Sequence, residues 1–384
     1  MAARKAVDHS TRGEILVKIA QIAPRWKSLP PRGTSDSERT LAYLTEELVR
    51  RGHNVTLFGN ADSRTGAQLE TPCAAPFSGK AADWGRAGAT IRDAEQAFEI
   101  RADEFDIVHS HFGIGGFPMA QRCATPTLTT LQERLDLPEY ISLFEQFQDL
   151  PLVSTSDAQR RTLAWVSWQQ TIYPGVPAEL YGFNPQPGNY LAFLGSLSLE
   201  EGLGLAIEVA RRAHLPLRVA SRQDEAEGVP CSLPISLLIA DPYVEWLGEL
   251  CEEEKNDFLG EALALVCTAT GPGSSGLCVA EALACGTPVV AFDGGLAAEM
   301  IYDHVTGFTC ESINEMVEVL PLIGDLDRRE CRAAFEKRFS TARMAEHYLS
   351  LYQRLIDASR SPRGYDASVV KMVQPDMRPI IVPR

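Results

Sequence analysis

The sequence predicts an α/β protein of two Rossmann-like domains, each a parallel sheet covered by helices. Two observations carry this prediction. Short apolar runs of strand length alternate with helical patterns along the chain, which is typical of parallel βαβ units. The pattern also restarts after residues 181–188, a segment rich in glycine, proline and asparagine that we interpret as a linker. A chain of 384 residues is long enough for two ordinary domains.

The first domain is expected to begin with a buried strand followed by an amphipathic helix. Ile15–Ala23 is an apolar run broken only by Lys18 and Gln21. Ser35 and Glu38 then stand three residues apart, the spacing of a capping box, and leucines follow at helical spacing. The later strands expected in this domain are Val55–Phe58, Ile107–His109, Thr127–Leu131, Leu152–Thr155 and Thr171–Tyr173.

The second domain repeats the alternation, and the parallel arrangement predicts a cleft at the carboxyl ends of the strands. Its expected strands are Tyr190–Leu194, Leu217–Ala220, Val244–Leu247, Ala264–Cys267 and Pro288–Phe292. Its expected helices are Leu203–Ala213, Glu252–Leu259 and Leu277–Ala284. Residues 325–360 carry a further strong helical pattern.

Composition excludes several classes of protein. The net charge of −15 argues against nucleic acid as a general partner, because phosphate binding needs an excess of lysine and arginine. No apolar run approaches the roughly 20 residues that span a bilayer, and residues 1–13 lack the apolar core of a secretion signal, so we expect a cytoplasmic protein. The nine cysteines include no Cys-x-x-Cys pair and no zinc-type spacing with histidine. The sequence therefore predicts reduced thiols, no metal site and no other cofactor.

The segment Gly276–Val290 is the most informative part of the chain. It indicates a short helix, a glycine stop and an apolar strand. Further collinear anchors are residues 18–24, 30–32, 47–53, 55–58, 105–111, 153–160, Glu299 and residues 305–308. With these anchors the chain resembles the family 4 retaining glycosyltransferases from Ile15 to about residue 360.

The resemblance implies the GT-B fold, in which two Rossmann-like domains face each other across a cleft and the last helix returns to the N-terminal domain. Applied to this chain, it implies an N-terminal tail (residues 1–14), an acceptor-side domain (15–182) and a donor-side domain (183–340). A crossover helix (341–360) and a proline-containing tail (361–384) would follow.

The resemblance also implies a donor site around the helix that follows Gly276. In the family a glutamate on this helix holds the ribose of the sugar nucleotide, and here that residue is Glu281, with Gly276 and Leu277 lying beside the nucleotide. A carboxylate early in a helix is favoured by the helix dipole as well. The sequence leaves both roles of Glu281 open.

Four positions depart from the residues that the family uses to hold a diphosphate. Ser35 and Asp36 stand where the family has paired glycines at the start of the first helix, and a carboxylate there competes for the helix dipole. Ser196 and Glu201 stand where the family has an arginine and a lysine. A unit charge contact at about 4 Å is worth roughly 4 kcal/mol at an effective dielectric near 20. We therefore expect a diphosphate in the usual position to be repelled.

Two more positions change the sugar side of the site. Gly273 replaces a glutamate that the family places near the donor sugar, and Gln132 replaces a histidine. His109 and His111 follow a strand end, where the functional residues of α/β folds gather, and are the candidate catalytic residues. A strand-end histidine is more often a hydrogen-bonded structural residue, and we favour that interpretation.

The sequence thus favours a family 4-like protein with a non-catalytic or chemically altered role as a binding or scaffold protein. The alternative is an active retaining glycosyltransferase that moves a hexose from a nucleotide sugar to an acceptor. A nucleotide or sugar is the candidate ligand in both cases. The tail, residues 361–384, has four prolines and two apolar patches, and is the candidate contact for a protein partner.

Overall fold

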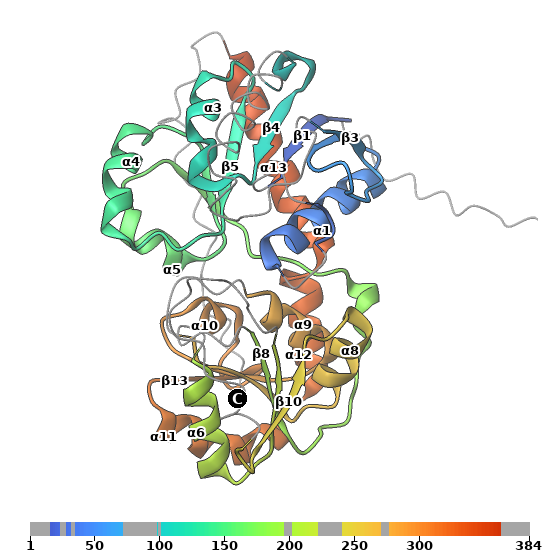
Figure 1. Cartoon of the computed structure of the whole chain (residues 1–384), viewed down its shortest axis with the longest axis vertical. Coiled ribbons are helices and arrows are strands. Elements are labelled where there is room, and N and C mark those ends of the chain that lie inside the picture. The colour runs from blue at the N-terminus through green and yellow to red at the C-terminus, as the bar shows by residue number, and fades with distance from the viewer. Residues whose placement is uncertain are drawn as a thin grey trace, which may run out of the picture.

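The computed structural model describes residues 16–23, 28–31, 35–71, 98, 101–195, 202–221, 240–269 and 276–361. These residues form two α/β units, which lie one above the other in Figure 1. The chain passes from the upper unit to the lower one between residues 172 and 190. Each unit has its own parallel sheet, as the alternating pattern predicts.

The first sheet has seven parallel strands. They are β1 (Lys18–Ile22), β2 (Asn54–Phe58), β3 (Gln68–Glu70), β4 (Ile107–Ser110), β5 (Thr127–Leu131), β6 (Leu152–Ser154) and β7 (Trp168–Thr171). Their order is β3-β2-β1-β4-β5-β6-β7, so β1 lies in the middle and pairs with both β2 and β4. The helices of this unit are α1 (Asp36–Arg50), α3 (Phe117–Arg122), α4 (Ile141–Gln146) and α5 (Asp157–Arg160). Short 3₁₀ turns span Ala102–Glu104, Gly113–Gly116, Pro138–Tyr140, Arg161–Leu163 and Ala178–Leu180.

The second sheet has six parallel strands. They are β8 (Leu191–Leu194), β9 (Leu217–Ala220), β10 (Val244–Gly248), β11 (Ala264–Cys267), β12 (Val289–Phe292) and β13 (Gly307–Cys310), in the order β10-β9-β8-β11-β12-β13. Its helices are α6 (Leu203–Ala213), α8 (Glu252–Gly260), α9 (Leu277–Cys285), α10 (Leu296–Met300), α11 (Ile313–Val319), α12 (Arg328–Arg338) and α13 (Thr341–Arg360), with a 3₁₀ turn at Leu320–Asp325.

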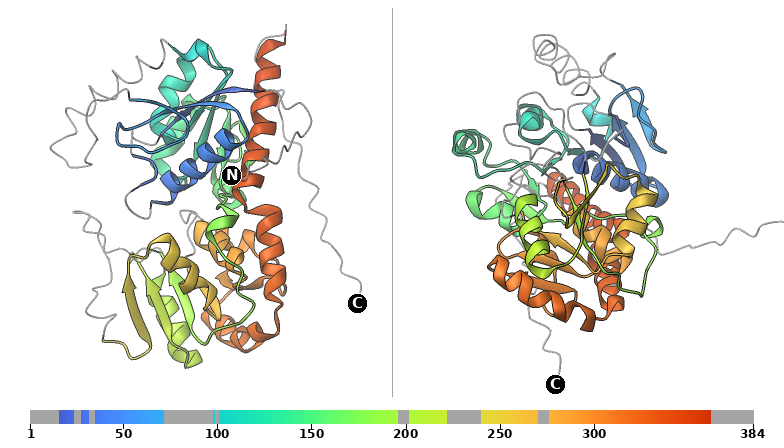
Figure 2. Two further views of the ribbon diagram at one scale, coloured as in Figure 1. Left: turned by 90° about the vertical axis from the view of Figure 1, so that its right-hand side faces the viewer. Right: turned by 60° about the horizontal axis from the view of Figure 1, so that its bottom comes forward.

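The last helix, α13, returns to the first unit. Figure 2 shows α12 along the lower unit and α13 continuing from it along the upper one. The buried side chains Met344, Tyr348 and Leu351 of α13 share one hydrophobic cluster with Ile19 and Ile107 of the first sheet. The predicted fold, two Rossmann-like domains joined by a returning C-terminal helix, is confirmed.

Some local predictions differ from the structure. The strand expected at Thr171–Tyr173 lies earlier, because β7 pairs Trp168 with Leu152 and buries the indole. The short edge strands β3 and β13 are absent from the prediction. Ser35 is the N-cap of α1, but its side chain accepts no capping hydrogen bond, so the expected capping box is wrong at this residue.

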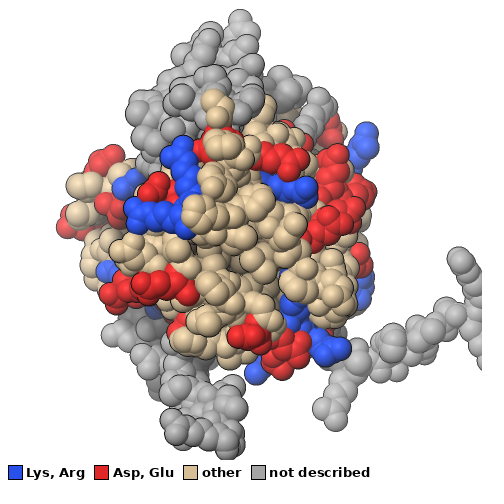
Figure 3. All heavy atoms as spheres, turned by 90° about the horizontal axis from the view of Figure 1, so that it is seen from below, with Lys and Arg blue, Asp and Glu red and all other residues tan. Residues whose placement is uncertain are grey.

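The surface and the helices add two observations. On the face of the lower unit seen from below, acidic and basic side chains alternate around an uncharged centre among the described atoms (Figure 3). Among the described residues, no helix is both long enough and apolar enough to cross a lipid bilayer.

Candidate functional site

The candidate site is organised around α9, an almost wholly apolar helix that carries a single carboxylate. Gly276 begins the helix with a left-handed φ of 70°, and a Cβ there would lie 2.8 Å from the side chain of Leu296, so only glycine fits. Leu277 is fully buried in the core of the second domain. Glu281 is only 1% exposed. A carboxylate buried to this degree requires charged or hydrogen-bonding partners.

The main partner of Glu281 comes from the other domain. Arg39 lies in the first turns of α1, and its Nη2 atom forms an ion pair with Oε1 of Glu281. The same guanidinium lies 2.9 Å from Glu252 and 3.3 Å from Asp36, and it donates a hydrogen bond to Tyr43 at 3.2 Å. Burial opposes the charge of Arg39, but Glu281 and the other carboxylates outweigh it and raise its pKa above the ordinary value.

Two further side chains complete the contacts of this carboxylate. The hydroxyl oxygen of Tyr181, in the segment that joins the domains, lies 2.7 Å from both Glu281 and Glu252, and its single proton is shared between the two carboxylates. Burial and the adjacent carboxylates raise the pKa of Tyr181, so it remains a protonated donor. Lys255 of α8 is buried, with its Nζ atom 3.9 Å from Glu281 and 3.6 Å from Glu252.

These five charged residues form what we call the interdomain ion cluster: Asp36, Arg39, Glu252, Lys255 and Glu281. Three carboxylates in it face two cations. A diphosphate brought to this cluster would therefore meet an excess of negative charge. The Nε atom of Arg39 is buried and has no hydrogen-bond partner within the part of the chain that the structure describes.

The start of α1 brings Ser35 and Asp36 close to this cluster. Asp36 is the first residue of the helix and lies one turn before Arg39, which donates to its carboxylate. The pair keeps one of the guanidinium donors turned toward α1 itself. At the paired-glycine position of the family, this chain therefore has a carboxylate that is engaged by an arginine.

Gln132 lies at the carboxyl end of β5, in the first domain. Its amide Nε2 is buried and has no hydrogen-bond partner among the described residues. The next residue, Glu133, accepts hydrogen bonds from the backbone N–H groups of Ile114 at 2.8 Å and of Gln132 at 3.0 Å. A Cβ at Gly113 would lie 2.2 Å from this carboxylate, so the turn at residues 113–116 packs directly on Glu133.

His109 is a fully buried residue of β4, and its side chain contacts α13. Its ring nitrogens lie 2.6 Å from the Tyr352 hydroxyl and 2.7 Å from Oγ1 of Thr130. Burial, with a smaller effect of His111, lowers its pKa well below the ordinary value, so the ring is neutral. Both nitrogens are occupied by neutral hydroxyls, which is the environment of a structural residue.

His111, two residues further along β4 and the loop after it, is also buried. Its Nε2 atom lies 3.0 Å from the side-chain oxygen of Gln21, and its Nδ1 atom has no partner among the described residues. Burial lowers the pKa of His111 to about 3. Of the two candidate histidines, only His111 has a ring nitrogen without a partner among the described residues.

A second contact joins the domains at Glu299 of α10. Its carboxylate accepts hydrogen bonds from the backbone N–H groups of Asp157 at 2.8 Å and Ala158 at 2.5 Å, at the start of α5. Tyr173 also donates to it at 3.2 Å. Because α5 follows β6 and α10 follows β12, the carboxyl ends of the two sheets face each other. Burial raises the pKa of Glu299, although the two N–H groups oppose this.

Several predicted positions lie outside the described residues. They are Ser196, Glu201 and Gly273, together with residues 362–384 of the tail. Within the described ranges, no three histidine, cysteine, aspartate or glutamate side chains gather as a metal site would require. The seven cysteines of those ranges are free thiols.

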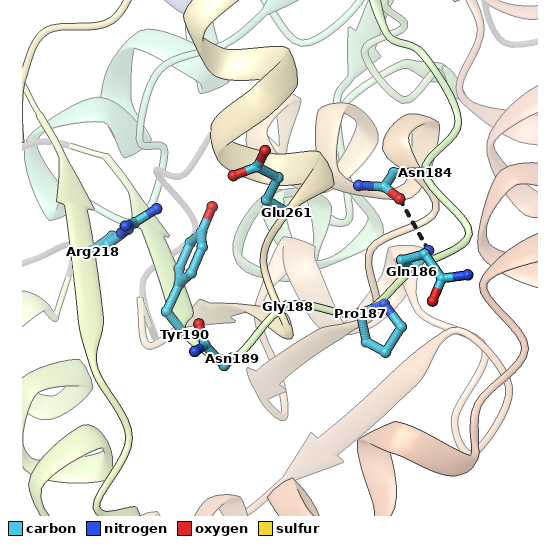
Figure 4. A pocket seen from close by; sticks show the side chains of 8 residues that line it. All are labelled: Asn184, Gln186, Pro187, Gly188, Asn189, Tyr190, Arg218 and Glu261. Atoms are coloured by element: carbon cyan, nitrogen blue, oxygen red, sulfur yellow. Dashed lines mark hydrogen bonds between the residues drawn. The ribbon is translucent and has the colours of Figure 1, made fainter.

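An open hollow of about 330 Å³ lies at the other end of α8 from the ion cluster. Figure 4 shows it between the joining segment, Tyr190, Arg218 and Glu261. The Tyr190 hydroxyl donates to the backbone oxygen of Phe258 at 2.6 Å, and the Arg218 guanidinium lies 4.2 Å from the centre of the Tyr190 ring. Arg218 also donates to Glu245 at 2.8 Å, so both Tyr190 and Arg218 are already engaged by other protein groups, and we do not assign the hollow a ligand.

Comparison with known protein families shows to which family the chain belongs. The model of Glycosyltransferase Family 4 matches residues 37–177, and that of Glycosyl transferases group 1 matches residues 183–319. The chain belongs to the family 4-like glycosyltransferases. No match to this chain was found among curated proteins.

Solved structures agree on the fold of this family 4-like chain. A glycosyltransferase of avilamycin A biosynthesis superposes with a TM-score of 0.65 at 21% identity, covering 89% of this chain and 98% of its own. Sucrose-phosphate synthase from Thermosynechococcus elongatus gives a TM-score of 0.68 at 17% identity, with coverage of 89% and 100%. HepE from Anabaena, solved in complex with UDP and glucose, gives 0.63 at 15% identity, with coverage of 88% and 100%. At these identities the likeness concerns the GT-B fold.

Sequence reasoning found Glu281 in this family 4-like chain but missed the residues that enclose it. Arg39 stands on the predicted first helix, three residues after Asp36, and therefore on the same face. Lys255 stands three residues before the buried Phe258 on α8, so helical spacing places it on the buried face. That spacing was the available signal, although it does not reveal which residue lies opposite.

Proposed function

We propose that this chain is a family 4-like glycosyltransferase homologue that serves as a binding or scaffold protein and does not turn over a nucleotide sugar. The observation that carries the proposal is the ion pair between Glu281 and Arg39. One oxygen of the carboxylate that would hold a ribose, Oε1 of Glu281, is already occupied by Arg39 of the first domain and by Tyr181 of the joining segment. The charge around it is also of the wrong sign for a diphosphate.

The loss of charge bears on catalysis as well as on binding. A retaining transfer without a protein nucleophile depends on preorganised positive groups at the departing diphosphate, and removal of a single such donor can cost on the order of 100-fold in rate. Ser196 and Glu201 remove two cations from the positions that the resemblance assigns to this task. Within the part of the chain that the structure describes, the cations beside Glu281, Arg39 and Lys255, are both engaged by carboxylates.

The candidate ligand class is a nucleotide or a sugar. HepE and a pneumococcal O-GlcNAc transferase are structural neighbours that were solved with UDP and a sugar. The retained carboxylate of Glu281 and the unpartnered nitrogen of His111 are groups that hydroxyl-rich ligands can use. We expect binding of such a ligand in the unmodified protein to be weak, since Glu281 must first lose Arg39.

An active retaining glycosyltransferase is the second candidate. The observation that favours it is the position of Glu281 on α9, in the helix that begins at the glycine turn of Gly276, in a chain whose described residues form both sheets of the GT-B fold. On this alternative, a relocated set of cations would have to neutralise the diphosphate. Arg160, whose Nη1 atom lies 3.0 Å from Oγ1 of Thr171, is a described candidate for that set.

The test combines turnover with binding. The protein is incubated with UDP-, GDP- and ADP-glucose, and free nucleotide is measured by chromatography. We expect no release above that of buffer. Release that disappears in Glu281→Gln but persists in Glu253→Gln, an exposed glutamate of α8, would refute the non-catalytic proposal and establish the glycosyltransferase. Calorimetry with UDP, GDP and ADP, each with the same three proteins, gives the affinity independently of turnover.

A further inference from the structure

Glu281 and Arg39 belong to different domains, and their ion pair is buried. Arg39 lies on α1 of the first domain and Glu281 on α9 of the second, 242 residues apart along the chain. The exposed fraction of each side chain is 6% and 1%. Tyr181, in the segment that joins the domains, donates to the same carboxylate. Three separate parts of the molecule therefore meet at one carboxylate.

We propose that Arg39 is an interdomain latch that holds the two domains together and keeps ribonucleosides away from Glu281. The inference concerns the regulation of the site described above, and it rests on the proposed function only in treating Glu281 as the nucleoside-facing carboxylate. A ribose that donates two hydroxyls to Glu281 needs both carboxylate oxygens, and Arg39 and Tyr181 already occupy one of them, Oε1. The latch must therefore open before a nucleoside can bind.

The charges are arranged so that opening leaves neither member of the pair without a partner. Arg39 also donates to Asp36, which lies three residues earlier on its own helix. Glu281 also lies 3.9 Å from the ammonium of Lys255, in its own domain. Breaking a buried ion pair is costly mainly because it strands a charge. Here Arg39 and Glu281 each keep a counter-ion in their own domain. Separation of the domains therefore avoids the largest part of that cost.

Water has a route to this latch. Asp36 and Glu252, the outer members of the cluster, each have about a third of their side-chain surface exposed (34%). The Nε atom of Arg39 has no hydrogen-bond partner among the described residues, so the guanidinium is not fully satisfied in the closed arrangement. On opening, that donor gains a water molecule, which partly offsets the lost ion pair.

The consequence for affinity follows from the population of the open form. A ligand that binds only the open form has an apparent dissociation constant equal to its intrinsic value divided by the open fraction. If the closed form dominates by a factor of about ten, removal of the latch should tighten binding about tenfold. A ribonucleoside is the appropriate probe, because it presents the ribose without the charge of a phosphate.

The experiment compares Arg39→Met with Arg50→Met in the full chain. Arg50 lies on the same helix, is 67% exposed and pairs with Glu47. Binding of uridine, adenosine and guanosine is measured by calorimetry, and the radius of gyration by small-angle X-ray scattering. We expect Arg39→Met to bind at least one nucleoside about tenfold more tightly than the unmodified protein and to have a larger radius of gyration. Arg50→Met should match the unmodified protein in both.

A second variant allows the proposal to be tested even if Arg39→Met does not fold. Glu252→Gln removes one carboxylate partner of Arg39 at a partly exposed position, and should give changes of the same direction and smaller size. Unchanged nucleoside affinity in both variants would overturn the proposal. Tighter binding at an unchanged radius of gyration would also overturn it, since Arg39 would then block Glu281 only locally. Turnover of a nucleotide sugar by the unmodified protein is a separate result. It would refute the proposed function, and the latch would still be tested by the nucleoside affinities and the radius of gyration.

Discussion

Acid should destabilise the first domain through its two buried histidines. His109 and His111 lie at the centre of the first sheet, and the groups that contact them, Gln21, Thr130 and the tyrosines of α13, are neutral. Burial lowers the pKa of His109 well below its ordinary value and that of His111 to about 3. The folded protein therefore holds both rings neutral at a pH at which the unfolded chain protonates them.

The size and sign of the effect follow from this difference in pKa. Below the unfolded pKa of about 6.5 the unfolded state binds a proton that the folded state does not, so the free energy of unfolding falls as the pH falls. The fall is about 1.4 kcal/mol per pH unit for each histidine, and it continues until the folded pKa is reached. For His111 the window therefore runs from about pH 6.5 to about pH 3. Between pH 7.5 and pH 5.0 we expect a loss of about 2 kcal/mol from this residue.

The assay is urea unfolding at pH 7.5 and pH 5.0, followed by circular dichroism. The quantity compared is the pH-dependent change in the free energy of unfolding, so an overall loss of stability in a variant does not enter. His111→Gln should lose about 2 kcal/mol less than the unmodified protein over this range. The control is His304→Asn, which removes an exposed histidine of the second domain at a position whose left-handed φ of 61° suits asparagine, and it tests whether loss of a histidine outside the first domain has the same effect. Equal losses in His111→Gln and the unmodified protein would refute the reasoning.

Two further predictions concern the second domain, and thermal unfolding tests both. In Gly188→Ala the new Cβ would lie 1.6 Å from the backbone oxygen of Glu261, so we expect a loss of about 2–3 kcal/mol, whereas Gly324→Ala meets no atom within 4 Å and should change stability by less than about 1 kcal/mol. Equal effects of the two substitutions would contradict this packing. Arg328 is buried and donates to three backbone carbonyls and one threonine hydroxyl, so Arg328→Met should cost about 3 kcal/mol by leaving several acceptors unsatisfied, and a loss below about 1 kcal/mol would show that water replaces it.

The fold was predictable from the sequence because its strands are buried on both faces. Such strands are short runs rich in apolar and β-branched residues with clear boundaries, and Thr127–Leu131, Leu217–Ala220 and Ala264–Cys267 are strands over the predicted ranges. The helix Leu203–Ala213 also has its predicted bounds, set by a glycine before it and a basic last turn. The edge strand β3 was not predicted, for the opposite reason. The three residues of β3 are partly exposed and carry no such run.

The surroundings of the candidate site were not predictable in the same way. Helical spacing shows that Arg39 lies on the buried face of α1, but not that Glu281 faces it from another domain. The same holds for His109, whose partner Tyr352 lies 243 residues away on the last helix. Such contacts depend on how domains and helices pack against one another. Local sequence patterns do not indicate which elements pack together. What the sequence did contain was the imbalance of charge, since the changes at Ser196 and Glu201 are visible without a structure.

That imbalance and the buried ion pair support each other physically. A carboxylate as deeply buried as Glu281 must be compensated by a cation or by hydrogen-bond donors, whether these belong to a ligand, a metal or the protein. A family member with a positively charged diphosphate site can offer Glu281 to a ribose, because the ligand brings hydrogen-bond donors and its phosphates are neutralised elsewhere. In this chain the neutralising positions are changed, and Arg39 supplies the compensation from α1 instead. The presence of a family residue is therefore weaker evidence of activity than the charges around it, and the prediction that Arg39→Met frees Glu281 follows from that electrostatic argument alone.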